Sequence, residues 1–286
     1  MKIAPLTPVF AARIEDVDLT RPLDDAVFGE IRAAFEEHSV LVFSGQPLDD
    51  EGQGAFSRRF GPLEVTLSAN PASGTTFQRQ SNLDIRTGGV IPPDDRRMLY
   101  QLANQLWHSD SSFKRVPALC SLLSGRIVPP EGGATELASA RAAYAELPEG
   151  LRRRVEGLAC VHDFTWSRDQ VRPGILTDKE RAEVPPVEHP LVRANPVNGR
   201  RTLFIGAHAS HIVGMSIEDG RALLRELTAF VTQPRFCYRH EWREHDLIIW
   251  DNRCVLHRAT PFDSTRHHRL MQRTTVSGDP REPAVR

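Results

Sequence analysis

Short strand-like segments separated by turn signals fill much of the second half of the chain, and this pattern most limits the fold. Residues 118–128 read as a strand, and HPLVRA and RTLFIG flank Asn198-Gly199, a pair typical of a hairpin turn. Residues 235–277 are again strand-like. Many late strands around a few helices favour a mainly β fold, with one antiparallel β core and flanking helices, over a series of βαβ units.

The remaining elements are predicted from hydrophobic periodicity. The segment 39–45, SVLVFSG, is a continuous apolar run and reads as a buried strand. Helices are expected at 25–37, after Asp24 as a cap, at 50–60, at 139–156 with a bend at Pro148, and at 216–230. Two stretches lack periodicity and are expected to be long loops, 66–103 as a substrate lid and 165–187 as a second loop. The length fits a single domain over 1–286.

Composition excludes several classes of function. The chain has 36 basic and 37 acidic residues and a net charge of −1, so nothing indicates a nucleic-acid partner. No apolar run approaches the roughly 20 residues that span a bilayer, and the N-terminus does not resemble a signal peptide. The four cysteines are far apart and form no CxxC pair, so we expect reduced thiols in a cytoplasmic protein without a membrane partner.

The segment Trp107-His108-Ser109-Asp110 carries the sharpest local signal. On an extended segment the side chains of His108 and Asp110 project to the same side, as two ligands of one metal ion require. A surface His–Asp pair is the alternative, and it is the commoner reading of this motif alone. His257, after the apolar segment DLIIWDN, supplies a third ligand. Two histidines and one carboxylate are typical of non-haem Fe(II) oxygenases, whereas the same set with Zn(II) would indicate a hydrolase.

Four segments together resemble a known family. LWHSDSSF, EGGATELAS, WDNRCVLHRATPFD and RHHRLMQRTTVSGD are similar in order and spacing to the TauD/TfdA family of Fe(II)- and 2-oxoglutarate-dependent dioxygenases. The resemblance extends over nearly the whole chain and is greatest to the 2,4-dichlorophenoxyacetate dioxygenase branch. It implies a double-stranded β-helix core of the jelly-roll, cupin-like type.

The resemblance also implies roles for individual residues. His108, Asp110 and His257 match the iron ligands, and Thr135 and Arg269 match the residues that bind the distal carboxylate of 2-oxoglutarate. An arginine fork with a hydroxyl donor suits a carboxylate. Four further residues match positions at the prime substrate: Arg273, Asn104, His208 and His211. For the two histidines, a structural role at a strand end is an equal alternative.

The implied reaction uses Fe(II), 2-oxoglutarate and O2 to hydroxylate a small anionic substrate, with succinate and CO2 as co-products. An aryloxyalkanoate would be cleaved to a phenol and glyoxylate, while an alkyl- or arylsulfonate is the alternative substrate. The 66–103 segment has no lysine, so four of its arginines are candidates for holding the substrate: Arg79, Arg86, Arg96 and Arg97. A second class of function is that of a catalytically silent relative, which binds an acid without turnover. Family members often form dimers or tetramers, so the resemblance raises the prospect of a homo-oligomer.

Overall fold

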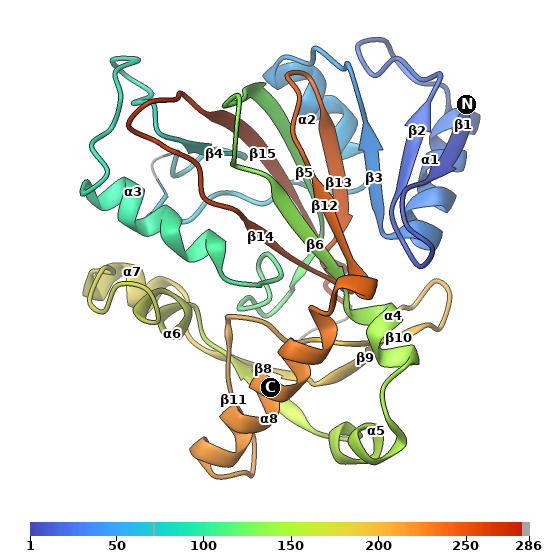
Figure 1. Cartoon of the computed structure of the whole chain (residues 1–286), viewed down its shortest axis with the longest axis vertical. Helices are drawn as coiled ribbons and strands as arrows, with labels where there is room; N and C mark the ends of the chain where they lie inside the picture. The colour runs from blue at the N-terminus through green and yellow to red at the C-terminus, as the bar shows by residue number, and fades with distance from the viewer. Residues whose placement is uncertain (71, 282–286) are drawn as a thin grey trace.

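A seven-stranded sheet forms the body of the molecule in the computed structural model, which describes residues 1–70 and 72–281 (Figure 1). Its neighbouring strands are antiparallel except β2 and β3, which are parallel. In spatial order the strands are β1 (Lys2–Pro5), β2 (Ala12–Glu15), β3 (Val40–Phe43), β13 (Leu247–Asp251), β5 (Ala118–Ile127), β15 (Leu270–Ser277) and β4 (Phe77–Ser81).

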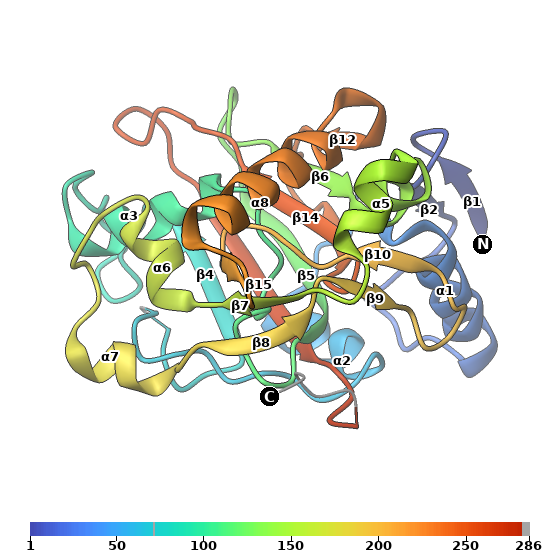
Figure 2. The ribbon, with the colours of Figure 1, turned by 90° about the horizontal axis from the view of Figure 1, so that it is seen from below.

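Three smaller sheets complete the β structure. One has the order β12 (Cys237–His240), β6 (Thr135–Ser139), β14 (Val255–Ala259), and another has the order β11 (Ala209–Ile212), β7 (Ala159–His162), β8 (Val187–Pro190). Strands β9 (Val192–Ala194) and β10 (Arg201–Leu203) form the hairpin predicted around Asn198-Gly199. The β11–β7–β8 sheet lies at the lower end of Figure 1, the end that Figure 2 views.

The helices are mostly short and lie around the sheets. They are α1 (Asp25–His38), α2 (Asp50–Arg58), α3 (Arg96–Gln101), α4 (Ala140–Ala145), α5 (Glu149–Val155), α6 (Phe164–Asp169), α7 (Asp178–Glu183) and α8 (Ile217–Val231), with 3-10 turns at Leu102–Gln105 and Pro234–Phe236. Asp24 caps α1 as predicted, because its side chain accepts a hydrogen bond from the Val27 amide. Within the described residues, none of the helices is both long and apolar enough to span a bilayer.

Both faces of the large sheet are buried at β3, which explains the continuous apolar run there. Leu41 and Phe43 pack in a cluster with Phe35 of α1. Val40 and Val42 point the other way, into a cluster that includes residues of β6 and β14. Successive strand residues alternate between faces, so a strand covered on both sides is apolar at every position.

Three sequence predictions were wrong in detail. The 66–103 segment contains β4, α3 and the start of a 3-10 turn, and the 165–187 segment contains α7 and most of α6. Strand β4, FQRQS, is polar and lies at the edge of the sheet, so it carries no apolar alternation. The helix expected at 139–156 is two helices, since α4 ends at Ala145 and α5 begins after Pro148. The protein has a mixed α/β structure with several sheets, and its assignment as a double-stranded β-helix stays a prediction.

Candidate active site

Three metal-binding side chains meet in the interior of the molecule. Ligand atoms of His108, Asp110 and His257 all lie within 4.8 Å of one another, and all three residues are buried. His108 Nε2 and His257 Nε2 lie 3.8 and 3.6 Å from the two carboxylate oxygens of Asp110. Ligands about 2 Å from one ion lie roughly 3–4 Å apart, so the spacing fits a single metal ion.

Backbone pairing joins the two segments that carry these ligands. The amide of His108 donates to the carbonyl of His257 at 3.0 Å, and the reverse bond measures 2.8 Å. Gly206 packs against this bridge with φ of +126°, and a Cβ there would lie 3.1 Å from the His108 Cα. Residues around His108 form this isolated bridge and then a turn, not a continuous strand, yet the side chains of His108 and Asp110 still converge.

The protonation states suit a divalent cation. Burial lowers the pKa of His108 and of His257, so both imidazoles are neutral near pH 7, the form that binds metals. Burial raises the pKa of the Asp110 carboxyl, but its neighbours together, first among them the charge of Arg273, outweigh burial and lower that pKa. His108 Nδ1 lies 2.7 Å from the Leu106 carbonyl, which orients Nε2 toward Asp110.

Asn252 organises the carboxylate ligand and was missed by sequence reasoning. Its Oδ1 accepts from the Asp110 amide at 3.1 Å and from Trp250 Nε1 at 3.0 Å. Its Nδ2 donates to Ser121 Oγ, which in turn donates to Asp110 Oδ2 at 2.7 Å. These buried hydrogen bonds hold Asp110 in one orientation, and they come from neutral groups that place no second charge beside its carboxylate.

Arg269 is a buried cation without a carboxylate partner among the described residues. Its Nη2 donates to the Gly133 carbonyl at 3.3 Å, while its Nε is buried and unpaired. Burial alone lowers its pKa to about 10. Thr135 is buried nearby on β6, and its Oγ1 accepts a hydrogen bond from Trp242 Nε1 at 3.0 Å. That bond leaves the Thr135 hydroxyl hydrogen free to donate.

These features fit a dianionic co-substrate with one carboxylate away from the metal. An unpaired guanidinium in a dry interior is costly, and a carboxylate is the anion whose geometry matches its fork. In β6, Leu137 lies opposite His257 of β14, so Thr135, two residues away, faces the same side as His257. Thr135 and Arg269 are therefore suited to hold the distal carboxylate of a chelating 2-oxo acid.

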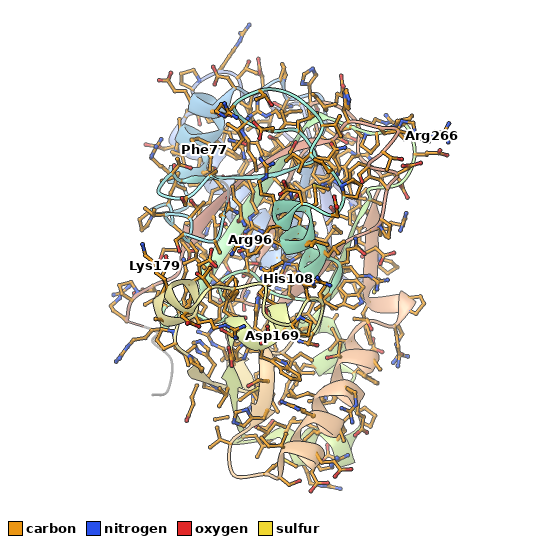
Figure 3. All side chains as sticks on the ribbon, turned by 90° about the vertical axis from the view of Figure 1, so that its left-hand side faces the viewer. Phe77, Arg96, His108, Asp169, Lys179 and Arg266 are labelled. Atoms are coloured by element: carbon orange, nitrogen blue, oxygen red, sulfur yellow. The ribbon has the colours of Figure 1, made fainter. Side chains whose placement is uncertain are left out.

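A pocket opens beside the metal ligands, between the helices at one side of the molecule. Its lining includes His108, Asp110, Asn104, His208 and Arg273. In the view of Figure 3, His108 is labelled between Arg96 of α3 and Asp169 of α6. Three of the four residues expected on the substrate side therefore line this pocket.

His211 is the fourth, and the structure does not bring it to this pocket. His208 lies in the turn before β11, where its Nδ1 lies 3.1 Å from Ser112 Oγ. His211 lies inside β11, with its Nδ1 2.9 Å from Ser210 Oγ. Residues 209 and 210 of β11 lie between the two histidines, and the strand pairing shifts between Ala209 and His211, so closeness in sequence does not bring His211 to the face of His208. The alternative reading of His211, as a residue of a strand, agrees with this placement.

The arginines expected to hold the substrate also lie elsewhere. Arg79, Arg86 and Arg97 line a different pocket, and Arg96 pairs with Glu180. The pocket at the metal ligands instead contains Lys114 and Arg168, together with the segment 64–67. Arg168 lies in the region that was predicted to be a second loop, where no sequence motif pointed to it.

Comparison with known proteins decides the family. The model described as "Taurine catabolism dioxygenase TauD, TfdA family" matches residues 2–275. The chain belongs to the TauD/TfdA family. It is an Fe(II)- and 2-oxoglutarate-dependent dioxygenase, and His108, Asp110 and His257 form its facial triad of metal ligands.

Individual TauD/TfdA relatives match over almost their full lengths. An alpha-ketoglutarate-dependent 2,4-dichlorophenoxyacetate dioxygenase of Cupriavidus pinatubonensis is 44% identical, covering 95% of this chain and 96% of the relative. An (S)-phenoxypropionate/alpha-ketoglutarate-dioxygenase of Sphingobium herbicidovorans is 37% identical, covering 97% and 95%. The crystal structure of AAD-2 in complex with Mn(II) and N-oxalylglycine superposes with a TM-score of 0.92 at 40% identity, covering 100% of both chains.

Proposed function

We propose that this dioxygenase hydroxylates an aryloxyalkanoate, such as a phenoxyacetate, at the carbon between the ether oxygen and the carboxylate. The observation that carries the proposal is the chemistry of the pocket beside the triad. Aromatic side chains, among them Tyr100, Phe113 and Phe164, lie in it together with cationic ones. An aromatic ring on a short acid presents the complementary groups. The relatives named for phenoxy acids support the same substrate class.

Each group of residues has a separate task in this reaction. With Fe(II), 2-oxoglutarate and O2 bound, the centre replaces one C–H bond of the substrate by C–OH and releases succinate and CO2. Arg269 and Thr135 bind the distal carboxylate of 2-oxoglutarate, and the neutral imidazoles and Asp110 hold the metal. Arg273 and Asn104 face the pocket and contact the acidic end of the substrate.

The product of hydroxylation breaks down by its own chemistry. The hydroxylated carbon of an aryloxyacetate carries both an OH and the aryl ether, so it is a hemiacetal. The bond between this carbon and the ether oxygen breaks, and the hydroxyl proton passes to the departing aryloxide, which yields a phenol and glyoxylate. The enzyme therefore needs only to position the substrate C–H bond and exclude water.

The architecture suits this role in two further respects. We assign the seven-stranded sheet and the β12–β6–β14 sheet as the two walls of a double-stranded β-helix within a single domain. We also assign the 66–103 segment as a lid, since residues at its start, including Thr66 and Leu67, lie over the pocket. Closure over a bound substrate would protect the reaction from water.

The test is substrate-dependent succinate formation. Protein reconstituted with Fe(II) without air is given 2-oxoglutarate, O2 and one acid from a panel of phenoxyacetates, both enantiomers of 2-phenoxypropionate, taurine and benzenesulfonate. Phenoxy acids should raise succinate well above the substrate-free background. If taurine or benzenesulfonate raises it more, the sulfonate alternative replaces this proposal. If no acid raises it, the aryloxyalkanoate assignment fails.

A further inference from the structure

The charged side chains that line the pocket do not balance. Three cations line it, Lys114, Arg168 and Arg273, but only two carboxylates, Glu64 and Asp110. Lys114 Nζ lies 2.6 Å from Glu64 Oε2, and Arg273 Nη1 lies 2.6 Å from Asp110 Oδ1. Arg168 is left without an acidic partner among the described residues, so the pocket lining carries one uncompensated positive charge.

Arg168 is held firmly by neutral groups. It lies near the end of α6 and is only 7% exposed. Its guanidinium carbon lies 4.5 Å from the centre of the Tyr100 ring and 4.8 Å from that of Phe164. Its Nη1 donates to the Tyr100 carbonyl at 3.2 Å. Two rings and one backbone bond fix the plane of the guanidinium but do not neutralise its charge.

The unused donors of Arg168 form a fork. Nε is buried without a partner, and no described residue accepts a hydrogen bond from Nη2. The Nε–H and Nη–H groups on one edge of a guanidinium are parallel and match the two oxygens of a carboxylate. Burial lowers the pKa of Arg168 and the charge of Arg273 adds to this, although Tyr100 and Asp110 act in the opposite direction. An anion bound at this edge would relieve both effects.

We propose that Arg168 binds the acidic group of the aromatic substrate. It lies in the pocket with Arg273, and no carboxylate of the lining neutralises its charge. Arg273 is already engaged by Asp110 and Gln78, so its charge is only partly available. The rings of Phe113 and Phe164, with centres 4.6 Å apart, lie on the same side as Arg168 and suit the aryl part of such an acid. This inference rests on the proposed function for the identity of the acid. The alternative is a structural role, in which Arg168 only ties α6 to α3.

Binding measurements on protein loaded with Mn(II) and 2-oxoglutarate, without O2, separate the two roles. Phenoxyacetate and its uncharged isostere phenoxyacetamide are titrated calorimetrically into wild type, Arg168→Gln, Arg168→Lys and Arg172→Gln. Arg172 is an exposed residue four positions along, which makes it the matched control. Arg168→Gln should weaken phenoxyacetate about 10- to 100-fold, as expected for a lost charged hydrogen bond pair, and change phenoxyacetamide by less than about twofold. Arg172→Gln should change neither.

Arg168→Lys keeps the charge but loses the fork, so it should weaken phenoxyacetate by an intermediate amount. Arg168→Lys also replaces Arg168→Gln as the test variant if thermal unfolding shows that Arg168→Gln does not fold. Equal weakening of the acid and the amide would mean a structural role and overturn the proposal. So would unchanged affinity for the acid, or a wild type that binds neither compound. If the acid binds through Arg168 but yields no succinate in air with Fe(II), the proposed function fails and the anion site stands.

Discussion

Replacing Arg269 by methionine should weaken 2-oxoglutarate binding by roughly 100-fold without unfolding the protein. The guanidinium is buried, and its pKa falls from 12.5 to about 10 through burial alone. At 1.36 kcal/mol per pH unit, this shift corresponds to roughly 3 kcal/mol of unfavourable free energy for the unpaired charge. A carboxylate that pairs with Arg269 can recover about that amount, equivalent to roughly 100-fold in affinity.

The two states of the protein should therefore respond differently to Arg269→Met. Without 2-oxoglutarate, the loss of a buried unpaired charge offsets the loss of the Gly133 bond, so the melting temperature should stay close to that of wild type. With 2-oxoglutarate at 100 times the wild-type Kd, wild type gains about 2.7 kcal/mol, whereas a variant weakened 100-fold gains only about 0.4 kcal/mol. Thermal unfolding of the Mn(II)-loaded protein with and without 2-oxoglutarate measures both quantities.

Two further variants serve as controls. Arg266→Met changes an exposed arginine three residues earlier and should keep the full 2-oxoglutarate effect. Arg273→Met should reduce the affinity for 2-oxoglutarate far less than Arg269→Met, because Arg273 is paired with Asp110. If Arg269→Met keeps the wild-type stabilisation by 2-oxoglutarate, or if the two variants lose it equally, the division of labour between these arginines is refuted.

Three smaller predictions follow from single contacts. Trp242→Phe removes the hydrogen bond that positions Thr135, so it should raise the KM for 2-oxoglutarate by about five- to tenfold with little change in kcat. A lower kcat at unchanged KM would contradict this role of Trp242. Gly206→Ala adds a Cβ 3.1 Å from the backbone beside the metal ligands, so it should weaken Mn(II) binding. Gly214→Ala, also at positive φ but with open space around it, should not weaken Mn(II) binding. Equal Mn(II) affinities of the two variants would count against the packing argument. His162 is buried with both ring nitrogens unpaired, and burial lowers its pKa to about 3, so its contribution to folded-state stability declines as pH falls from about 6.5 toward 3. In denaturant titrations at acid pH, His162→Phe should lose less stability over that range than wild type. An unchanged pH dependence would disprove this role of His162.

The sequence predicts elements well where burial leaves a periodic trace. Strand β3 is apolar at every position because both faces of its sheet are covered, and α1 shows its cap and its apolar face. Strand β4 leaves no such trace, since its polar residues lie at a sheet edge and pair with β15. Helices of one or two turns, such as α6, are too short to show a period of 3.6 residues.

The same distinction applies to the site. His108, Asp110 and His257 were recognisable because a metal demands particular residue types at particular spacings, and the surrounding segments resemble a family. The proposed role of Arg168 depends on Tyr100 and Phe164 meeting it in space, and on the lack of a salt-bridge partner for it among the described residues. Neither condition can be read from local sequence. His211 was misplaced for the complementary reason, because proximity to His208 in sequence does not specify which face of a strand a side chain occupies.

The stoichiometry of products tests the central claim most directly. Reconstituted enzyme with Fe(II), 2-oxoglutarate, O2 and phenoxyacetate is sampled over several turnovers for phenol, glyoxylate and succinate. The account predicts that the three products form in equal amounts and that none forms when 2-oxoglutarate is omitted. Succinate without phenol would mean that phenoxyacetate is not the compound being hydroxylated, and phenol without 2-oxoglutarate would contradict the dioxygenase reaction itself.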